Sequence, residues 1–407
     1  MDKLHKHFNS GDPLEAAELN ELVDKINEGV DEINILAAEN MTDSIYLDFT
    51  KTNPLQVVTG DVNGEVIQWI RRNSHRYLAK YTEAGKITIC QLADDDSNYF
   101  AANGRTALLT GAHGDVMVHI PRFYYRVEEQ AADKWHIEVS LVKISEEWQE
   151  WDGKDLIGVY EGFVHDGKLA SRTGVASTGD VSQANFNSYA RARGTGYTIV
   201  QWHQHCMMAF LFWAEYGNTN CQSVIGYGTD SYEKETGQTD EMGMHDTDAA
   251  HTGNTGSINF WGLENWWGNK AEWVDNVVVN PTAVNGVWRI TDPDGTVREV
   301  QGPQTYASWI YPKSVTLGQK LDMIGKTMGG STSGSLGDGQ YIGDATSRVV
   351  LRSYYGANAN GGVVFAGSAG GASDVSANIG ARLAFRGEIH IETDVEAFIH
   401  LPVINPI

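Results

Sequence analysis

The sequence has few cysteines and no long hydrophobic run, and each shortage excludes a class of protein. The only cysteines are Cys90, Cys206 and Cys221, and no C-x-x-C pair occurs among them, which speaks against a disulfide framework. The longest apolar run covers only residues 206–214, whereas a helix that spans a bilayer needs about 20 residues. The first residues lack the apolar core of a signal peptide. We therefore expect a soluble protein, made in the cytoplasm, without membrane insertion.

Positive charge and proline are also scarce. The chain of 407 residues has 30 Lys and Arg against 53 Asp and Glu, a formal net charge of −23. Such a chain repels phosphate backbones, which argues against nucleic acid as a partner. Nine prolines against 44 glycines favour short strands and many turns over long helices.

Motifs of enzymes and metal sites are incomplete. Asp94–Tyr99 opens like a calcium loop but lacks the glycine and the glutamate that an EF-hand has at its sixth and twelfth positions. On a helix, His203 and His205 would point about 200° apart, so we expect buried, hydrogen-bonded histidines and no shared metal. Gly330–Gly334 has Thr332 where a nucleophilic serine would stand. The sequence therefore predicts no catalytic residue, no metal ligand and no cofactor.

The N-terminal residues 1–43 have a helical pattern. Asp12 is a good N-cap, and Pro13 suits the first helical position. Apolar residues recur in steps of four and three, a heptad seam, at Leu19, Val23, Ile26, Val30, Ile33 and Ala37. β-Branched residues at both seam positions favour a coiled coil of three or more helices over one of two. We expect a coiled coil that attaches and trimerises the protein; the alternative is a single amphipathic helix docked on its own domain.

The rest of the chain predicts an α+β fold. We assign a β-rich connecting region to residues 44–115 and the main domain to residues 116–407. Strand patterns occur at residues 44–50, 65–70, 86–92, 115–127 and 136–144. A β-hairpin is expected around Asp292–Gly295. Helices are expected at residues 182–194 and at residues 198–217, where an all-apolar pattern predicts burial and Gly217 a stop.

Four tryptophans fall within "FWGLENWWGNKAEWVDN", residues 260–276, which has neither a helical nor a strand period. Two explanations fit: a core built from loops, or a platform that holds a binding surface. Residues 348–386 also have an unusual composition, because about thirty residues of Gly, Ala, Ser and Asn with a few aromatics lie between two strand-like runs. That is the composition of a paratope. A disordered linker is the alternative, and the strand signature "GVVF" argues against it.

Several of these motifs resemble a known family. "WGLENWWGNKAEWVDN" is similar to the core motif of the formylglycine-generating-enzyme branch of the C-type-lectin fold, and "NIGARLAFRG" resembles its closing strand. "GDVMVHIPRFYYRV" and "YGNTNCQSVIGYG" resemble phage and prophage tail-fibre receptor-binding proteins of gut Bacteroidetes, some of them variable proteins of diversity-generating retroelements. The likeness covers roughly residues 66–391, and the N-terminal segment also resembles the head end of such fibres.

The resemblance implies a C-type-lectin-like fold whose buried tryptophans brace a C-terminal binding surface. It implies a homotrimer in the virion tail, with a protein or glycan receptor on a bacterium and other tail proteins at its N-terminus. Two departures matter. No cysteine follows Cys221, which argues against a formylglycine-type oxidoreductase, and the sugar-binding Glu-Pro-Asn and Gln-Pro-Asp motifs are missing. A bacterial adhesin or pilus tip is the alternative function, and the lack of a signal peptide argues against it.

The binding surface predicted on this basis lies between the two C-terminal strands. We expect these side chains to face the ligand: Ser353, Tyr354, Tyr355, Ala357, Asn358, Phe365, Ser368, Ser373, Asp374, Val375 and Ser376. The two tyrosines are the expected energetic anchors, because aromatics dominate binding hot spots. Arg382 and Arg386 are expected to be structural. The alternative is that Tyr354 and Phe365 turn inward and pack on the tryptophans.

Overall fold

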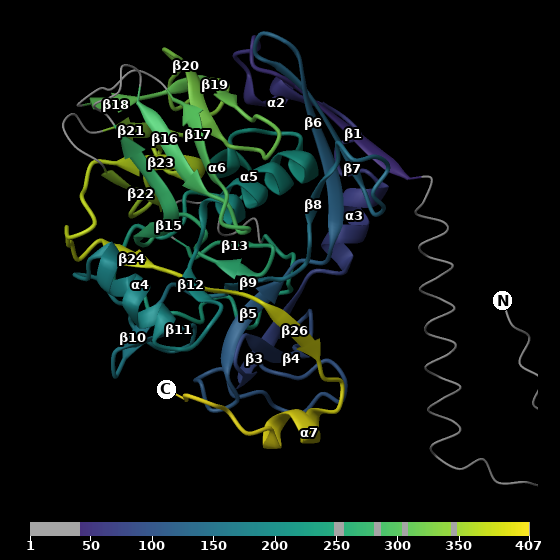
Figure 1. The fold of residues 1–407 in the computed structure, drawn as a ribbon, viewed down its shortest axis with the longest axis vertical. Coiled ribbons are helices and arrows are strands. Elements are labelled where there is room, and N and C mark those ends of the chain that lie inside the picture. The colour runs from purple at the N-terminus through teal and green to yellow at the C-terminus, as the bar shows by residue number, and fades with distance from the viewer. Residues whose placement is uncertain (1–40, 248–255, 281–285, 303–307, 343–347, 407) are drawn as a thin grey trace, which may run out of the picture.

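The computed structural model describes residues 41–247, 256–280, 286–302, 308–342 and 348–406. The coiled-coil helix predicted for the N-terminus falls almost wholly outside these residues. The described chain forms three large sheets, three two-stranded ribbons and a few helices (Figure 1). It is an α+β arrangement rich in strands.

The first sheet has five strands in the order β2-β1-β7-β6-β8. Its strands are β1 (Thr42–Asp48), β2 (Val58–Gly60), β6 (Phe123–Ala131), β7 (Lys134–Ser140) and β8 (Gln149–Trp151). The second sheet has seven strands in the order β12-β25-β9-β5-β3-β4-β26. Its strands are β3 (His75–Glu83), β4 (Lys86–Gln91), β5 (Asp115–His119), β9 (Asp155–Gly158), β12 (Tyr197–Ile199), β25 (Leu383–Arg386) and β26 (Glu388–Ile391).

The third sheet has eight strands and carries the C-terminal region. Its path is β17-β16-β15-β22-β23-β21-β18, with β24 paired to β15. Its strands are β15 (Ala271–Asn280), β16 (Val287–Thr291), β17 (Val297–Gln301), β18 (Ser308–Ile310), β21 (Gln340–Ile342), β22 (Arg348–Ser353), β23 (Gly362–Ser368) and β24 (Ile379–Ala381). The ribbons are β10 (Phe163–His165) with β11 (Lys168–Ala170), β13 (Asn259–Phe260) with β14 (Leu263–Glu264), and β19 (Pro312–Thr316) with β20 (Ile324–Met328).

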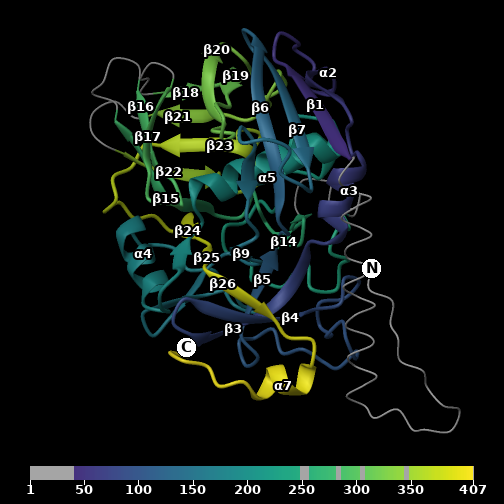
Figure 2. The ribbon, with the colours of Figure 1, turned by 45° about the vertical axis from the view of Figure 1, so that its right-hand side comes forward.

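One buried helix joins the layers. The helices are α2 (Pro54–Val57), α3 (Glu65–Arg72), α4 (Gln183–Arg191), α5 (Trp202–Tyr216), α6 (Cys221–Val224) and α7 (Val395–His400). Helix α5 lies between the five-stranded and eight-stranded sheets in both views (Figures 1 and 2) and contacts β15 and β23. Nearly all its residues are buried, and Gly217 ends it in the left-handed conformation. This confirms the burial and the stop predicted from its apolar pattern.

Two sequence-based assignments of elements were wrong in part. Residues 65–70, expected to form a strand, are part of helix α3. The buried positions Val66, Ile67 and Ile70 follow helical spacing, and the Asp43 carboxylate accepts the Ile67 N–H at 2.8 Å. The helix expected from residue 198 begins at Trp202, because Tyr197–Ile199 pairs with β25. The predicted hairpin is confirmed: β16 and β17 pair from Thr291↔Val297 outward.

The sheets mix early and late parts of the chain. Strand β1 pairs with β7, β3 pairs with β5, and β26 runs parallel to β4. The boundary predicted at residue 115 therefore separates strands that share a sheet.

The tryptophan-rich stretch forms part of the core. Every residue from 257 to 274 is buried, and Trp261, Trp266, Trp267 and Trp273 are each at most 1% exposed. The backbone turns through positive φ at Trp261, Asn265, Asn269 and Asn276. Asparagine tolerates this conformation better than most residues, which explains why asparagines alternate with the large rings.

Candidate ligand-binding surface

The predicted ligand-facing residues lie on two strands and on the loops beside them. Strands β22 and β23 are antiparallel neighbours near the middle of the eight-stranded sheet. The loop between them covers residues 354–361, and the segment after β23 covers residues 369–378. The structure thus places the predicted residues on β22 and β23 and on the segments that leave the two ends of β23, but it does not expose all of them.

Three predicted residues are buried, so their assignment to the ligand was wrong. Ser353 and Ser368 are 0% exposed, and Phe365 is 2% exposed. Strand β23 is hydrogen-bonded to β22 on one side and to β21 on the other, and helix α5 contacts it. All of Gly362–Ser368 is buried, so the side chains on both faces of β23 are covered.

The other predicted residues reach the surface. Four are exposed: Tyr355, Ser373, Asp374 and Val375. Four are partly buried: Tyr354, Ala357, Asn358 and Ser376. The Tyr354 ring lies 4.7 Å from the Tyr355 ring and 5.1 Å from the Phe365 ring, so it connects an exposed aromatic to a buried one. Phe365 thus turns inward and Tyr354 does so in part, as the alternative expected, whereas packing of these rings on the tryptophans stays a prediction.

The backbone is strained where the first loop leaves the sheet. Ser353 and Tyr354 have φ of 78° and 74°, a region that non-glycine residues rarely occupy. The pairing of β22 with β23 is irregular between Leu351 and Ser353. Strain of this kind persists only where the surrounding structure enforces it, and it clusters at functional sites. The strain therefore marks the start of this loop as a candidate site.

A third surface segment, residues 229–235, joins the two predicted loops. Gly356 lies against the carbonyl of Asp230. Asn269 accepts the Gly356 N–H on its carbonyl at 2.9 Å and the Lys234 N–H on its side chain at 3.3 Å. We call residues 229–235, 354–360 and 371–378 together the display surface. Sequence reasoning missed the third segment, although Tyr232 within a Gly- and Ser-containing polar stretch is the same kind of signal.

Lys270 fixes two of these segments from below. Its side chain is buried, and Nζ donates to the carbonyls of Tyr232 and Ala377 at 2.5 and 2.8 Å. Burial lowers the pKa of Lys270. The neighbouring Asn269 side chain donates to Glu161, whose pKa burial raises to about 7. Asn269 and Lys270 thus connect the display surface to the core.

Beneath these residues lies a network of buried charges. Glu272 binds both Arg352 and Arg382, and Arg352 lies 3.3 Å from the centre of the Trp266 ring. Arg382 also donates to the carbonyls of Gly158, Val159, Glu264 and Asn265. Arg386 pairs with Asp152 and Asp155. Both arginines are therefore structural, as expected, and Arg352 acts with them.

The segments of the display surface are anchored mainly through their own main chain. The carbonyls of Ala372, Ser376 and Asn378 accept the N–H groups of Ala184, Asp180 and Ala271 at 2.9–3.2 Å. The Asn358 carbonyl accepts from Gln222. Asn360 is an exception, because its side chain accepts from the Tyr311 hydroxyl at 2.6 Å. Exposed side chains can therefore change with little effect on these anchors.

The other motifs have structural surroundings. His203 lies 3.1 Å from Asp155, whereas His205 is buried with no hydrogen-bond partner among the described residues, contrary to expectation. Burial lowers the pKa of His205 well below its usual value, so it stays neutral. Gly330–Gly334 lies in a loop. Within the described ranges, no cluster of His, Cys, Asp and Glu could hold a metal, and no helix is long and apolar enough to cross a membrane.

Comparisons with known proteins give a distant likeness. No family model matches the chain, and no curated protein matches it. Among solved structures, it is similar to the Major Tropism Determinant U1 variant, with 13% identity, 78% of this chain and 73% of that chain covered, and a TM-score of 0.30. The P3c and I1 variants of the Major Tropism Determinant each match at 13% identity, with 77% and 72% covered and a TM-score of 0.28.

Proposed function

We propose that this protein is a receptor-binding protein at the tip of a phage or prophage tail fibre, and that the display surface binds a ligand on the bacterial surface. The observation that carries the proposal is the main-chain anchoring of residues 354–360 and 371–378 on a buried base. A ligand-binding surface must be rigid, yet its side chains must be available for contact. The anchoring supports both conditions.

The exposed side chains suit recognition. Tyr232, Tyr355 and Val375 are large apolar side chains that remain exposed on this surface. Aromatic side chains give a large contact area at low entropic cost, and the Ser, Gly and Asn residues around them give adaptable hydrogen bonds. We propose Tyr355 and Tyr232 as the main anchors for the ligand, with Ala357, Asn358, Ser373, Asp374 and Ser376 around them.

The proposal extends to the fold family and to diversification. We assign the main domain to the C-type-lectin-like fold, in its formylglycine-generating-enzyme-like branch, on the motifs around Trp266 and Arg382. Main-chain anchoring would also let a diversity-generating retroelement replace surface side chains without loss of the fold. The cysteines support binding over oxidation, since burial raises the pKa of Cys90 to about 11 and the pKa values of Cys206 and Cys221 well above 9.

The assembly proposed is a homotrimer in the virion tail. The heptad seam of residues 19–37 is its support, and three copies of a weak site on one fibre would multiply avidity. Light scattering on the full chain should give three times the chain mass of 44.7 kDa. A chain without residues 1–40 should give less than three times its own chain mass, because its trimer is weakened. A monomeric full chain would contradict the trimer.

The test of receptor binding is attachment to cells. Fluorescently labelled full chain is incubated with a panel of gut Bacteroidetes isolates, and bound fluorescence is measured for each. We expect staining of a subset of isolates, and loss of at least about tenfold in apparent affinity for a Tyr232→Ala, Tyr355→Ala double variant, because hot-spot aromatics contribute 1–2 kcal/mol or more each.

Tyr99→Ala is the matched control. Tyr99 is exposed to a similar extent, 43% against 38% for the two display-surface tyrosines, but lies in the bridge with Thr106. The control should stain the same isolates as the wild type. Equal staining by the double variant and the wild type would place the receptor-binding site elsewhere, and staining of no isolate by the wild type would count against the proposed function itself.

A further inference from the structure

Glu161 is a buried carboxylate that is held by neutral donors. It lies between β9 and β10 and is 2% exposed. Its two oxygens accept from the Lys270 N–H at 2.9 Å and from the side-chain amide of Asn269. The nearby arginines, Arg352 and Arg382, both pair with Glu272 instead. The charge of Glu161 is therefore stabilised mainly by amide groups.

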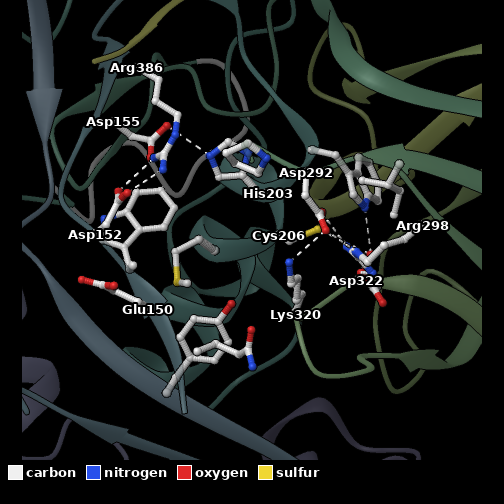
Figure 3. Close-up of a pocket in the computed structure, with 17 residues that line it drawn as sticks. Glu150, Asp152, Asp155, His203, Cys206, Asp292, Arg298, Lys320, Asp322 and Arg386 are labelled. Atoms are coloured by element: carbon white, nitrogen blue, oxygen red, sulfur yellow. Dashed lines mark hydrogen bonds and ion pairs between the residues drawn. The ribbon is translucent and has the colours of Figure 1, made fainter. Parts of the chain in front are cut away.

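Other buried carboxylates have a charged partner. They line a cavity of about 110 Å³ between the five-stranded sheet and the β16–β17 hairpin (Figure 3). Asp155 binds Arg386 there at 2.5 Å, and Asp292 binds Arg298 at 2.6 Å. Burial raises the pKa of both aspartates, but the basic groups that face them lower it further, so both stay ionised near neutral pH. Glu161 lacks such a partner.

The pKa of Glu161 consequently lies near neutral pH. Burial raises it to about 7, the like charge of Glu272 acts in the same direction, and Arg382 lowers it. The other charged groups that face Glu161 are Arg352 and Lys270. Glu161 therefore gains or loses its proton within the physiological range of pH.

The side-chain amide of Asn269 is oriented by its two partners. Its Nδ2 donates to Glu161, and its Oδ1 accepts the Lys234 N–H at 3.3 Å. A carboxylate can only accept hydrogen bonds and a main-chain N–H can only donate them, so this orientation satisfies both partners. As long as Glu161 is ionised, Asn269 ties residues 229–235 of the display surface to the core.

A protonated Glu161 cannot keep this arrangement. The proton goes to the oxygen that faces Asn269, because the other oxygen faces the Lys270 N–H, which cannot turn. Two donors then face each other, so the Asn269 amide turns over and its oxygen accepts from Glu161. Its NH₂ group then points at the Lys234 N–H, which loses its acceptor. Ser177 also faces the carboxyl group, but its buried hydroxyl makes no hydrogen bond within the described chain, whereas Asn269 is already in contact.

We propose that Glu161 and Asn269 form a proton switch, which releases the main chain around Lys234 from the core when Glu161 is protonated. The rest of the segment stays attached, because Lys270 Nζ still binds the Tyr232 carbonyl. Protonation thus loosens one of the three segments of the display surface and leaves the other two in place. The switch concerns the order of this segment and does not depend on which ligand the surface binds.

Hydrogen exchange at single amides of the full chain tests the switch without any ligand. Exchange is measured at pH 6 and pH 8, and each rate is compared with the intrinsic rate of that amide at the same pH. Protection of the Lys234 amide should fall about fivefold at the lower pH, because one hydrogen bond is lost. Protection of the Gly356 amide should not change, because it donates to the main-chain carbonyl of Asn269. Unchanged protection of Lys234, or an equal loss at both amides, would overturn the proposal.

Glu161→Gln removes the titrating group and keeps its shape. The new amide accepts from Lys270 and donates to a turned Asn269, so Lys234 should be weakly protected at both pH values. Glu264→Gln is the matched control, because it removes another buried carboxyl whose pKa burial raises to about 7. The control should keep the pH difference at Lys234. A pH difference that persists in Glu161→Gln, or that disappears in Glu264→Gln, would overturn the assignment to Glu161.

The wild-type measurement stands by itself if Glu161→Gln does not fold. The amides of Lys234 and Gly356 both bond to Asn269, one to its side chain and one to its main chain. A loss of protection at Lys234 alone supports the turning of the amide, and a loss at both indicates general loosening, which would contradict it.

Discussion

Residues 257–274 and the display surface share a composition but not an environment. Both are rich in glycine, asparagine and aromatics, and neither shows a clear helical or strand period. Yet residues 257–274 are all buried, whereas most of 354–360 and 371–378 is partly or fully exposed. The difference lies in what holds each segment. The tryptophan-rich segment is held by its side chains, and the display surface is held mainly by its main chain.

That difference predicts how much stability each region loses on mutation. A side chain that fills the core cannot be removed without a cavity, whereas a side chain above a main-chain anchor can be removed with little loss of stability. Four predictions test this contrast, from the largest expected effect to the smallest.

Trp267→Ala should lower the free energy of unfolding by roughly 3–5 kcal/mol. The side chain is fully buried, packs against Phe212 and Phe260, and donates from Nε1 to the Gly226 carbonyl at 2.8 Å. The measurement is chemical denaturation. Trp69→Ala, at a partly buried tryptophan on α3, should cost clearly less. Equal losses for the two variants would contradict a special role for the tryptophan-rich segment.

Glu264→Gln should change the pH dependence of stability. Burial raises the pKa of Glu264 to about 7, although its carboxylate accepts the Gly237 and Thr239 N–H groups. The pKa of this carboxyl is about 4.3 in the unfolded state, so between pH 4.3 and pH 7 the folded state binds more protons than the unfolded state. The contribution of Glu264 to stability is therefore full below about pH 4 and is lost as the pH rises through 7. The variant should gain on the wild type by about 3 kcal/mol between pH 4 and pH 8.

Thermal or chemical unfolding at pH 4 and pH 8 measures this change. Trp267→Ala is the control, because it removes no titrating group and its difference from the wild type should stay the same at both values. If the difference in unfolding free energy between Glu264→Gln and the wild type is the same at both pH values, burial does not raise the pKa of Glu264.

Tyr354→Ala should have an intermediate effect of about 1–2 kcal/mol. Its ring is partly buried between Tyr355 and Phe365, and aromatic pairs contribute about 0.5–1.5 kcal/mol beyond the area they bury. Burial also raises the pKa of Tyr354 to about 12, consistent with a half-covered hydroxyl. A loss as large as that of Trp267→Ala, measured by the same denaturation, would make Tyr354 a core residue.

Tyr232→Ala and Tyr355→Ala should have the smallest effects, each below about 1 kcal/mol, because both side chains are substantially exposed. The melting temperature of the double variant should stay within a few degrees of the wild type. A large drop would show that these side chains support the fold, and the contrast between the two regions would fail.

Parts of the fold were predictable because their signal is local. The hairpin follows from turn residues, and the burial of α5 follows from an apolar pattern on all sides. The buried role of the four tryptophans was expected only from the resemblance of their motif. By contrast, residues 65–70 were wrongly assigned to a strand. So short a segment fits both the helical and the strand period, and only its contacts with Asp43 and the core decide between helix and strand.

The candidate site was predictable in place but not residue by residue. Composition identified the region around residues 348–386, and Tyr355, Ser373, Asp374 and Val375 are exposed there. Strand β23 has no alternation that could have shown Phe365 and Ser368 to be buried, because a strand covered on both faces shows none. The segment 229–235 could not be placed either, since Asn269 and Lys270 join it to residues more than a hundred positions away.

The sequence by itself determined the acidic charge and the strand-rich α+β composition, because these depend on residue type and short-range period. Only the tertiary structure decided which side chains of residues 348–386 reach solvent, which loops share the display surface, and that charges from four parts of the chain enclose a cavity beside Tyr125. These features arise from pairings between distant strands. Their register is set by packing of the whole domain and cannot be read from any one segment.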